Sequence, residues 1–121
     1  MAYAIMDALI GSQPIADTST VQNHPLGTSV RAKVPTYGVG EFIYLVGVAS
    51  TAVASWVKYM EDGFTTSLLA ANDIGQVAVA MSANVASQYG WYQIKGKAIG
   101  KALASYADNG LVYATATAGS I

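Results

Sequence analysis

Apolar and polar residues alternate with a period of two along most of the chain, which is the pattern of strands with one buried face. Residues 30–34 are the clearest case, because their apolar side chains alternate with the two cations Arg31 and Lys33. Later runs are rich in β-branched and aromatic residues, which strands favour. Strands are therefore predicted at residues 30–34, 41–46, 53–59, 64–69, 76–81, 91–103 and 111–115.

Residues typical of turns separate these runs. Glu-Asp-Gly at residues 61–63 would join two strands as a hairpin, and similar combinations of Asp, Asn and Gly occur at residues 72–75 and 108–110. The segment 82–88 has a weak helical pattern, and we interpret it as a loop. Short strands joined by such turns predict an all-β fold, a single small domain of β-barrel-like or sandwich-like architecture.

The first 29 residues differ from the rest of the chain. They carry two of its prolines and many Ser, Thr and Asn residues, which oppose regular structure. We interpret residues 1–29 as an extended N-terminal arm and residues 30–121 as the β-rich domain. A flexible terminus is the alternative, although a solvated tail seldom keeps so many large apolar side chains. These side chains are candidate contacts with a partner: Tyr3, Ile5, Met6, Leu9 and Ile10.

Charge is scarce in this sequence. The 121 residues are 53% hydrophobic and only 11% charged, whereas an ordinary soluble domain carries about 25% charged residues. Such a surface is expected to lie in a membrane or against a partner. The membrane interpretation is disfavoured, because the uncharged runs 42–57 and 74–94 contain polar residues that would be costly in lipid. We therefore expect a partner surface and no membrane segment.

Candidate catalytic and metal-binding residues are few. The chain has no cysteine and one histidine, His24, which we expect to be solvent-exposed in the arm. Cysteine nucleophiles and zinc sites of three or four N or S ligands are therefore excluded. The carboxylates Asp62, Asp73 and Asp108 stand in predicted turns, where they favour local backbone hydrogen bonds. We expect a protein without enzymatic activity, cofactor or metal.

Lysines gather in the last third of the chain. If residues 91–103 form one strand, then Trp91, Lys95, Lys97 and Lys101 share a face. Aromatic and basic side chains together can bind single-stranded nucleic acid, but that function needs more of both kinds, and the net charge of −1 disfavours it. A solvated face is the plain alternative. We take these four residues as candidate contacts with an acidic protein partner.

Four stretches have the residue pattern of one class of protein, which is named below: residues 53–59, 75–80, 90–98 and 111–119. They resemble small structural proteins of tailed bacteriophages, and more specifically the head decoration, or capsid cement, proteins. The matching region spans residues 38–119. The resemblance consists of short motifs and brings no catalytic residues with it.

The resemblance implies a β-rich protein that binds the outer surface of the phage capsid, contacts neighbouring subunits of the major capsid protein and stabilises the mature head. It implies synthesis in the cytoplasm of the host bacterium and a final place on the virion. By analogy a homo-oligomer is expected, a trimer first and a dimer second. Two alternatives stay open. One is another phage component, of the tail tube, baseplate or fibre; the other is a carbohydrate-binding module that stacks sugars on Trp56, Trp91 and Tyr92.

Overall fold

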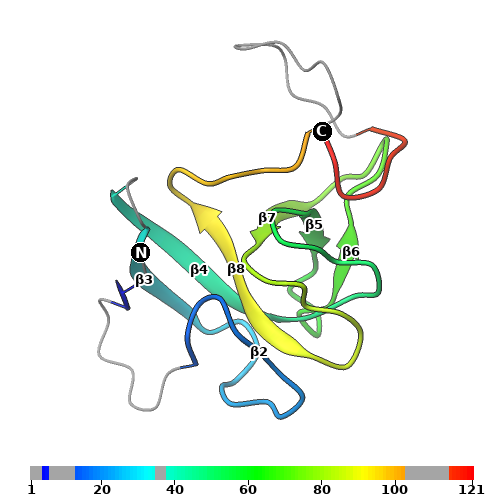
Figure 1. The fold of residues 1–121 in the computed structure, drawn as a ribbon. Coiled ribbons are helices and arrows are strands. Elements are labelled where there is room, and N and C mark those ends of the chain that lie inside the picture. The colour runs from blue at the N-terminus through cyan, green and yellow to red at the C-terminus, as the bar shows by residue number, and fades with distance from the viewer. Residues whose placement is uncertain (1–3, 6–12, 35–37, 103–114) are drawn as a thin grey trace.

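The computed structural model describes residues 4–5, 13–34, 38–102 and 115–121 (Figure 1). All regular secondary structure in these residues is β-strand, so the predicted all-β fold is confirmed. The strands are β1 (Ala4–Ile5), β2 (Thr18–Ser19), β3 (Ser29–Val34), β4 (Gly38–Val46), β5 (Trp56–Tyr59), β6 (Thr66–Leu68), β7 (Gln76–Ala80) and β8 (Tyr89–Lys95).

The strands form one antiparallel sheet in the order β1-β3-β4-β8-β7-β5-β6, and β2 pairs with β8 beside this path. Two hydrogen bonds join the β5–β6 hairpin back to the end of β4. The Val46 N–H donates to the Phe64 carbonyl at 3.3 Å, and the Thr66 hydroxyl donates to the Val46 carbonyl at 2.7 Å. The sheet therefore curls through β4, β8, β7, β5 and β6 into a barrel-like shape (Figure 1).

Most predicted strands coincide with observed ones, and the differences have local causes. The predicted strand 53–59 begins only at Trp56, because Ala54 has a left-handed backbone with φ of 71°. The predicted strand 91–103 ends at Lys95, because Gly96 turns the chain with φ of 97°. Residues 82–88 form a loop, as expected. The predicted turn at 108–110 and nearly all of the strand that follows it lie outside the described residues.

The sheet buries side chains on both faces. The inner face of the curl holds a cluster of strand residues with Phe64, Leu68 and Ile94 packed against it. The outer face of β3, β4 and β8 carries a second cluster that includes three aromatic side chains. The inner cluster is Ile43, Leu45, Val57, Tyr59, Ala78, Ala80 and Tyr92, and the outer cluster is Ile15, Val30, Ala32, Phe42, Tyr44 and Trp91.

Residues 13–29 pack against the outer face of the sheet. Ile15 belongs to the outer cluster, and His24 is buried with its ring centroid 5.1 Å from that of Tyr44. The expectation that His24 is solvent-exposed is therefore wrong. The outer face of β3, β4 and β8 is apolar, and this segment is what covers it.

Gln13 fixes this segment to the sheet through both its backbone and its buried side chain. The Gln13 N–H donates to Nε2 of His24 at 3.0 Å, and Oε1 of Gln13 accepts from the Tyr44 hydroxyl at 2.8 Å. The backbone carbonyl of Gln13 accepts from the Trp91 indole N–H at 2.8 Å. Since buried polar groups require partners, these bonds hold the segment in one position on the sheet.

The predicted arm contacts can be placed only in part. Ala4–Ile5 form β1, and Ile5 pairs with Ala32 of β3. The other candidates lie outside the described residues: Tyr3, Met6, Leu9 and Ile10. The interpretation of residues 1–29 as an arm therefore stays a prediction for the region before residue 13.

Candidate interaction surface

Trp91 was expected to contact a partner, and the structure corrects that expectation. Its side chain is fully buried, at 0% exposure, and its ring packs against Tyr44 with centroids 5.0 Å apart. A large aromatic on a central strand gains more by filling the core than it could at a surface. Tyr92, on the opposite face of β8, is equally buried. Of the three proposed sugar-stacking side chains, only Trp56 reaches the surface.

The three candidate lysines are exposed, but they do not share a strand. Lys95 ends β8, whereas Lys97 and Lys101 lie in the segment 96–102, which has no regular secondary structure. The strand periodicity used to place them on one face therefore applies only up to Lys95. The segment runs from the end of β8 across to β5, so Lys95 and Lys97 lie near its start and Lys101 lies at its far end, against Trp56.

Trp56 fixes the far end of this connection. We call residues 95–101, from the last residue of β8 to the contact with Trp56, the lysine loop. The Trp56 indole N–H donates to the Lys101 carbonyl at 3.0 Å, and the Lys101 N–H donates to the Ala54 carbonyl at 2.8 Å. Gly100 lies directly against the indole ring, so that a side chain there would overlap it. The loop is therefore attached to β5 by both hydrogen bonding and packing.

Gln93 fixes the near end of the lysine loop. Its buried side-chain amide donates to the carbonyls of Lys95 at 3.1 Å and Lys97 at 2.9 Å. Residue 96, between Lys95 and Lys97, passes close to β4: a Cβ there would lie 3.0 Å from the Cα of Gly40, so only glycine fits without a shift of the backbone. Both ends of the loop are thus held by side chains of the sheet, and this arrangement presents the lysines on a defined backbone.

A groove of about 400 Å³ runs along the lysine loop. Trp56, Val77 and Val79 give it an apolar side, and the exposed Lys95 and Lys97 give it a basic side. The remaining lining residues are Ala78, Gln93, Ile94, Gly96 and Ala98. An apolar groove bordered by cations fits a partner segment that carries both apolar and acidic groups.

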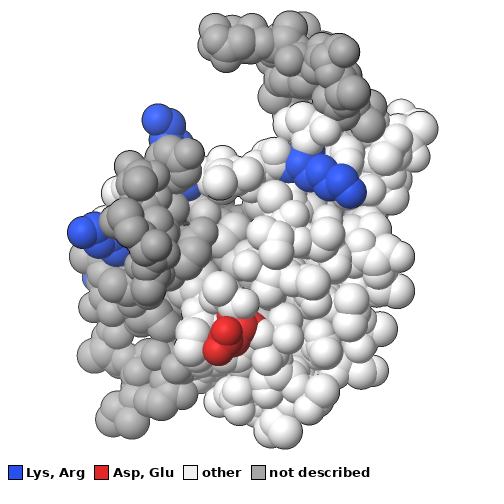
Figure 2. All heavy atoms as spheres, in the orientation of Figure 1, with Lys and Arg blue, Asp and Glu red and all other residues white. Residues whose placement is uncertain are grey.

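One face of the molecule carries few charged side chains. Figure 2 shows a face that is mostly uncharged, with basic side chains toward its upper and left margins and a small acidic patch. Within the described part of the chain, no group of three or more His, Asp or Glu side chains could hold a metal ion. The described residues also include no helix long and apolar enough to cross a membrane.

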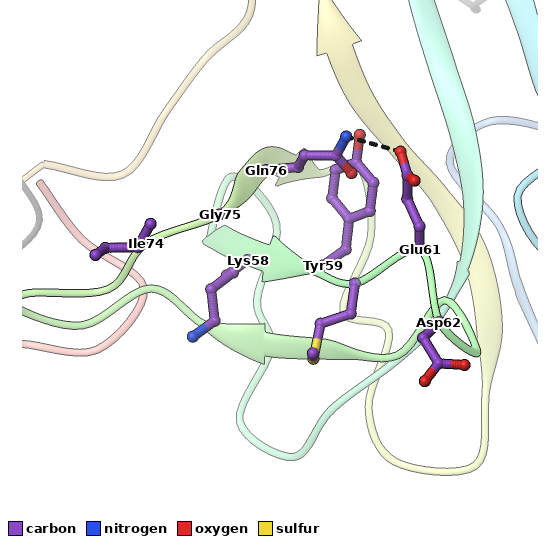
Figure 3. A pocket seen from close by; sticks show the side chains of 8 residues that line it. Lys58, Tyr59, Glu61, Asp62, Ile74, Gly75 and Gln76 are labelled. Atoms are coloured by element: carbon purple, nitrogen blue, oxygen red, sulfur yellow. Dashed lines mark hydrogen bonds between the residues drawn. The ribbon is translucent and has the colours of Figure 1, made fainter.

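A second hollow, of about 410 Å³, lies where β5 ends and β7 begins (Figure 3). Glu61 accepts a hydrogen bond from the Gln76 amide at 2.9 Å on one side of it. Burial raises the pKa of Tyr59 above its usual value, and the charge of Glu61 raises it further. We call this feature the β5–β7 hollow. Sequence reasoning missed it, because its residues come from two turns that only the sheet register brings together.

Asp73 holds the turn beside this hollow. It accepts the Ala70 N–H at 2.8 Å and forms an ion pair with Lys58 at 3.3 Å. These two contacts, the backbone hydrogen bond first, lower the pKa of the Asp73 carboxyl below its usual value. The prediction that Asp73 serves a turn through local backbone bonding is confirmed for this residue.

Comparison of the chain with protein-family models, with curated proteins and with solved structures found no significant match. The described residues form a small, all-β, barrel-like domain with a groove bordered by Lys95 and Lys97.

Proposed function

We propose that this chain is a structural protein of a tailed-bacteriophage virion. It binds the outer surface of the capsid and cements neighbouring subunits of the major capsid protein, which stabilises the mature head. The observation that carries the proposal is the lysine loop, an exposed basic segment fixed at both ends beside an apolar groove. The resemblance of residues 38–119 to head decoration proteins supports the same role.

The size of the surface is sufficient for such a role. The accessible surface of the chain is 6812 Å², and a specific interface buries at least about 1,000 Å² over both partners. Each contact therefore needs only a small share of this surface. Several contacts with different capsid subunits can form on one small domain, and multivalent attachment makes weak contacts effectively intramolecular.

The chemistry of the groove specifies the kind of contact. Charged rims contribute mostly to association rate and specificity, whereas the apolar side formed by Trp56, Val77 and Val79 supplies area that leaves water on docking. The capsid segment that fits carries an acidic side chain next to an apolar one. Attachment through Lys95 and Lys97, which border the groove, is then weakened by salt, because exposed charges are screened.

Co-sedimentation with expanded capsids that lack the protein tests the proposal. Charge reversal of the loop by Lys95→Glu or Lys97→Glu, at the border of the groove, is expected to weaken binding about tenfold and to flatten its dependence on salt. Lys33→Glu is the matched control, since it makes the same charge change on an exposed residue of β3. Heads loaded with the wild-type protein should also release DNA at a higher temperature than bare heads.

Two results would overturn the proposal. One is an absence of binding of the wild-type protein to capsids. The other is equal binding by the loop variants and the Lys33→Glu control, which would leave the lysine loop merely solvated. A tail component is the alternative within the same class, and location in the particle separates it from a head protein. The carbohydrate alternative loses support, because Trp91 and Tyr92 are buried.

A further inference from the structure

The pairing between β7 and β8 stops before either strand is used to its full length. Two residue pairs join these strands, Val79 with Gln93 and Ala80 with Tyr92. The first part of β7 and the last part of β8 extend beyond these pairs, and Figure 1 shows the tip of β8 turning away from β7. The groove beside the lysine loop lies at this divergence, because residues of both diverging ends line it.

A β-bulge in β8 accounts for the divergence. Opposite β4, Lys95 pairs with Glu41 and Gln93 pairs with Phe42, so Ile94 is an extra residue of β8. A bulge bends its strand and increases the local twist. The end of β8 therefore leads away from β7. Among the described strands, the first part of β7 then has a neighbour only on the side of β5.

The backbone of Val77 faces the groove. The Ala80 N–H donates to the Ser55 carbonyl at 2.9 Å, so the backbone groups of Ala80 point toward β5. Because these directions alternate along a strand, the N–H and C=O of Val77 point the other way, toward the side of β8. The Lys95 carbonyl, which would be the next acceptor on β8, accepts from the side-chain amide of Gln93 at 3.1 Å. Val77 thus presents the edge of a strand to the groove.

A side chain of the same groove is also incompletely bonded. Gln93 is 3% exposed and lines the groove, and its Oε1 has no hydrogen-bond partner within the part of the chain that the structure describes. Buried acceptors without a donor are rare in folded proteins. An extended peptide carries N–H and C=O groups at the spacing of a strand, so it is the kind of ligand that offers partners to Val77 and Gln93 together.

We propose that an extended segment of the capsid protein enters this groove and adds to β7 as a further strand. Its backbone pairs with the N–H and C=O of Val77, and one of its N–H groups donates to Oε1 of Gln93. In such strand addition the main-chain bonds supply affinity, and the apolar side formed by Trp56 and Val79 selects the side chains. The inference rests on the proposed function, since it names the conformation and bonding of the capsid segment.

Hydrogen exchange, measured by mass spectrometry with fragmentation to single amides, tests whether β7 is the docking edge. In the free protein the Val77 amide should exchange about 100-fold faster than the Ala78 amide, which points toward β5. On expanded capsids the Val77 amide should become protected about tenfold or more. Slow exchange of Val77 in the free protein overturns the inference, and so does unchanged exchange on capsids that bind the protein. Protection that appears only as the free protein is concentrated would mean that a second copy fills the groove, which also overturns it.

The replacement Val77→Pro removes the donor itself. Proline is tolerated in a strand where the N–H faces solvent, so the bonds between β7 and β5 should remain. Val77→Thr is the matched control, because it has a similar shape and keeps the N–H. In co-sedimentation with expanded capsids, Val77→Pro is expected to bind about tenfold more weakly than wild type and Val77→Thr within about threefold of it. Thermal melting checks that both variants fold.

The outcomes separate this inference from the proposed function. Equal binding by folded Val77→Pro and Val77→Thr contradicts strand addition and leaves capsid binding standing. Failure of the wild-type protein to bind capsids contradicts both. If Val77→Pro does not fold, the exchange of the Val77 amide in the wild-type protein decides the question.

Discussion

Ile15 provides the sharpest test of how the N-terminal region is built into the fold. Its side chain is 2% exposed and packs in the outer cluster with Phe42, Tyr44 and Trp91. The replacement Ile15→Ala removes three carbon atoms from this cluster. If residues 13–29 are part of the folded domain, the substitution must destabilise the whole domain rather than loosen a terminus.

The expected magnitude follows from cavity formation. Buried Ile→Ala substitutions cost 2–5 kcal/mol, and a value of about 3 kcal/mol suits a site lined by large aromatic rings. The entropy of unfolding for a chain of 121 residues is about 0.25 kcal/mol per kelvin. The melting temperature should therefore fall by about 12 °C.

Thermal and urea unfolding, followed by far-UV circular dichroism and tryptophan fluorescence, measure this effect. Val21→Ala is the matched control, since Val21 lies in the same segment but is 65% exposed; its cost should stay within about 0.5 kcal/mol. Equal melting temperatures for the two variants would refute the docking of residues 13–29. Deletion of residues 1–27 tests the same point. We expect it to uncover Trp91 and to unfold the protein, whereas a stable truncated domain would refute the docking.

Three further substitutions test other parts of the structure. Gly96→Ala should destabilise the fold by about 2 kcal/mol in urea unfolding. Gly38→Ala should cost less, because Gly38 has a similar φ but open space around an added Cβ. Equal costs for the two variants would exclude the close approach of residue 96 to Gly40. Tyr92→Phe removes the hydroxyl that accepts from the Asn84 amide at 3.1 Å and should cost about 1–2 kcal/mol in the same assay; a neutral effect would contradict that bond. Asp73→Asn should lower the melting temperature at pH 7. Because the pKa of Asp73 is lowered in the folded state, its stabilisation is present above the pKa of the unfolded chain and lost as pH falls through the folded pKa, so the difference from wild type should vanish in acid; a difference independent of pH would refute this.

Strand periodicity and turn composition were sufficient to predict the fold class and most of the sheet. They succeeded where a local signal dominates, as in β3, where the cations Arg31 and Lys33 are exposed and Val30 and Ala32 are buried. They failed beyond Lys95, because Gly96, with φ of 97°, ends the strand while the alternation of residue types continues.

The packing of residues 13–29 against the outer face of the sheet could not be predicted from the local sequence pattern. Proline and small polar residues oppose regular structure, but an irregular segment can still be fully docked when tertiary contacts satisfy its backbone. Gln13 accomplishes this here by bonding to His24, Tyr44 and Trp91, which lie far apart in the sequence. The burial of Trp91 was hidden for the same reason, since nothing near it in sequence indicates what covers its ring.

The lysine loop was predicted correctly as an exposed basic feature but with the wrong local structure. The sequence itself places Lys95, Lys97 and Lys101 close together, and charged side chains are seldom buried. The attachment of the loop to Trp56 depends on a contact across 45 residues of sequence. The apolar side of the groove comes from β5 and β7, so only the register of the sheet places it beside the lysines.

The central claim is that the chain is a structural protein of the phage head. Immunogold labelling of purified virions, viewed by negative-stain electron microscopy, tests it most directly. The claim predicts gold particles distributed over the capsid surface, with no labelling of tails, and loss of the label from particles assembled without the protein. Label confined to the tail, or absence of the protein from purified virions, would contradict the claim.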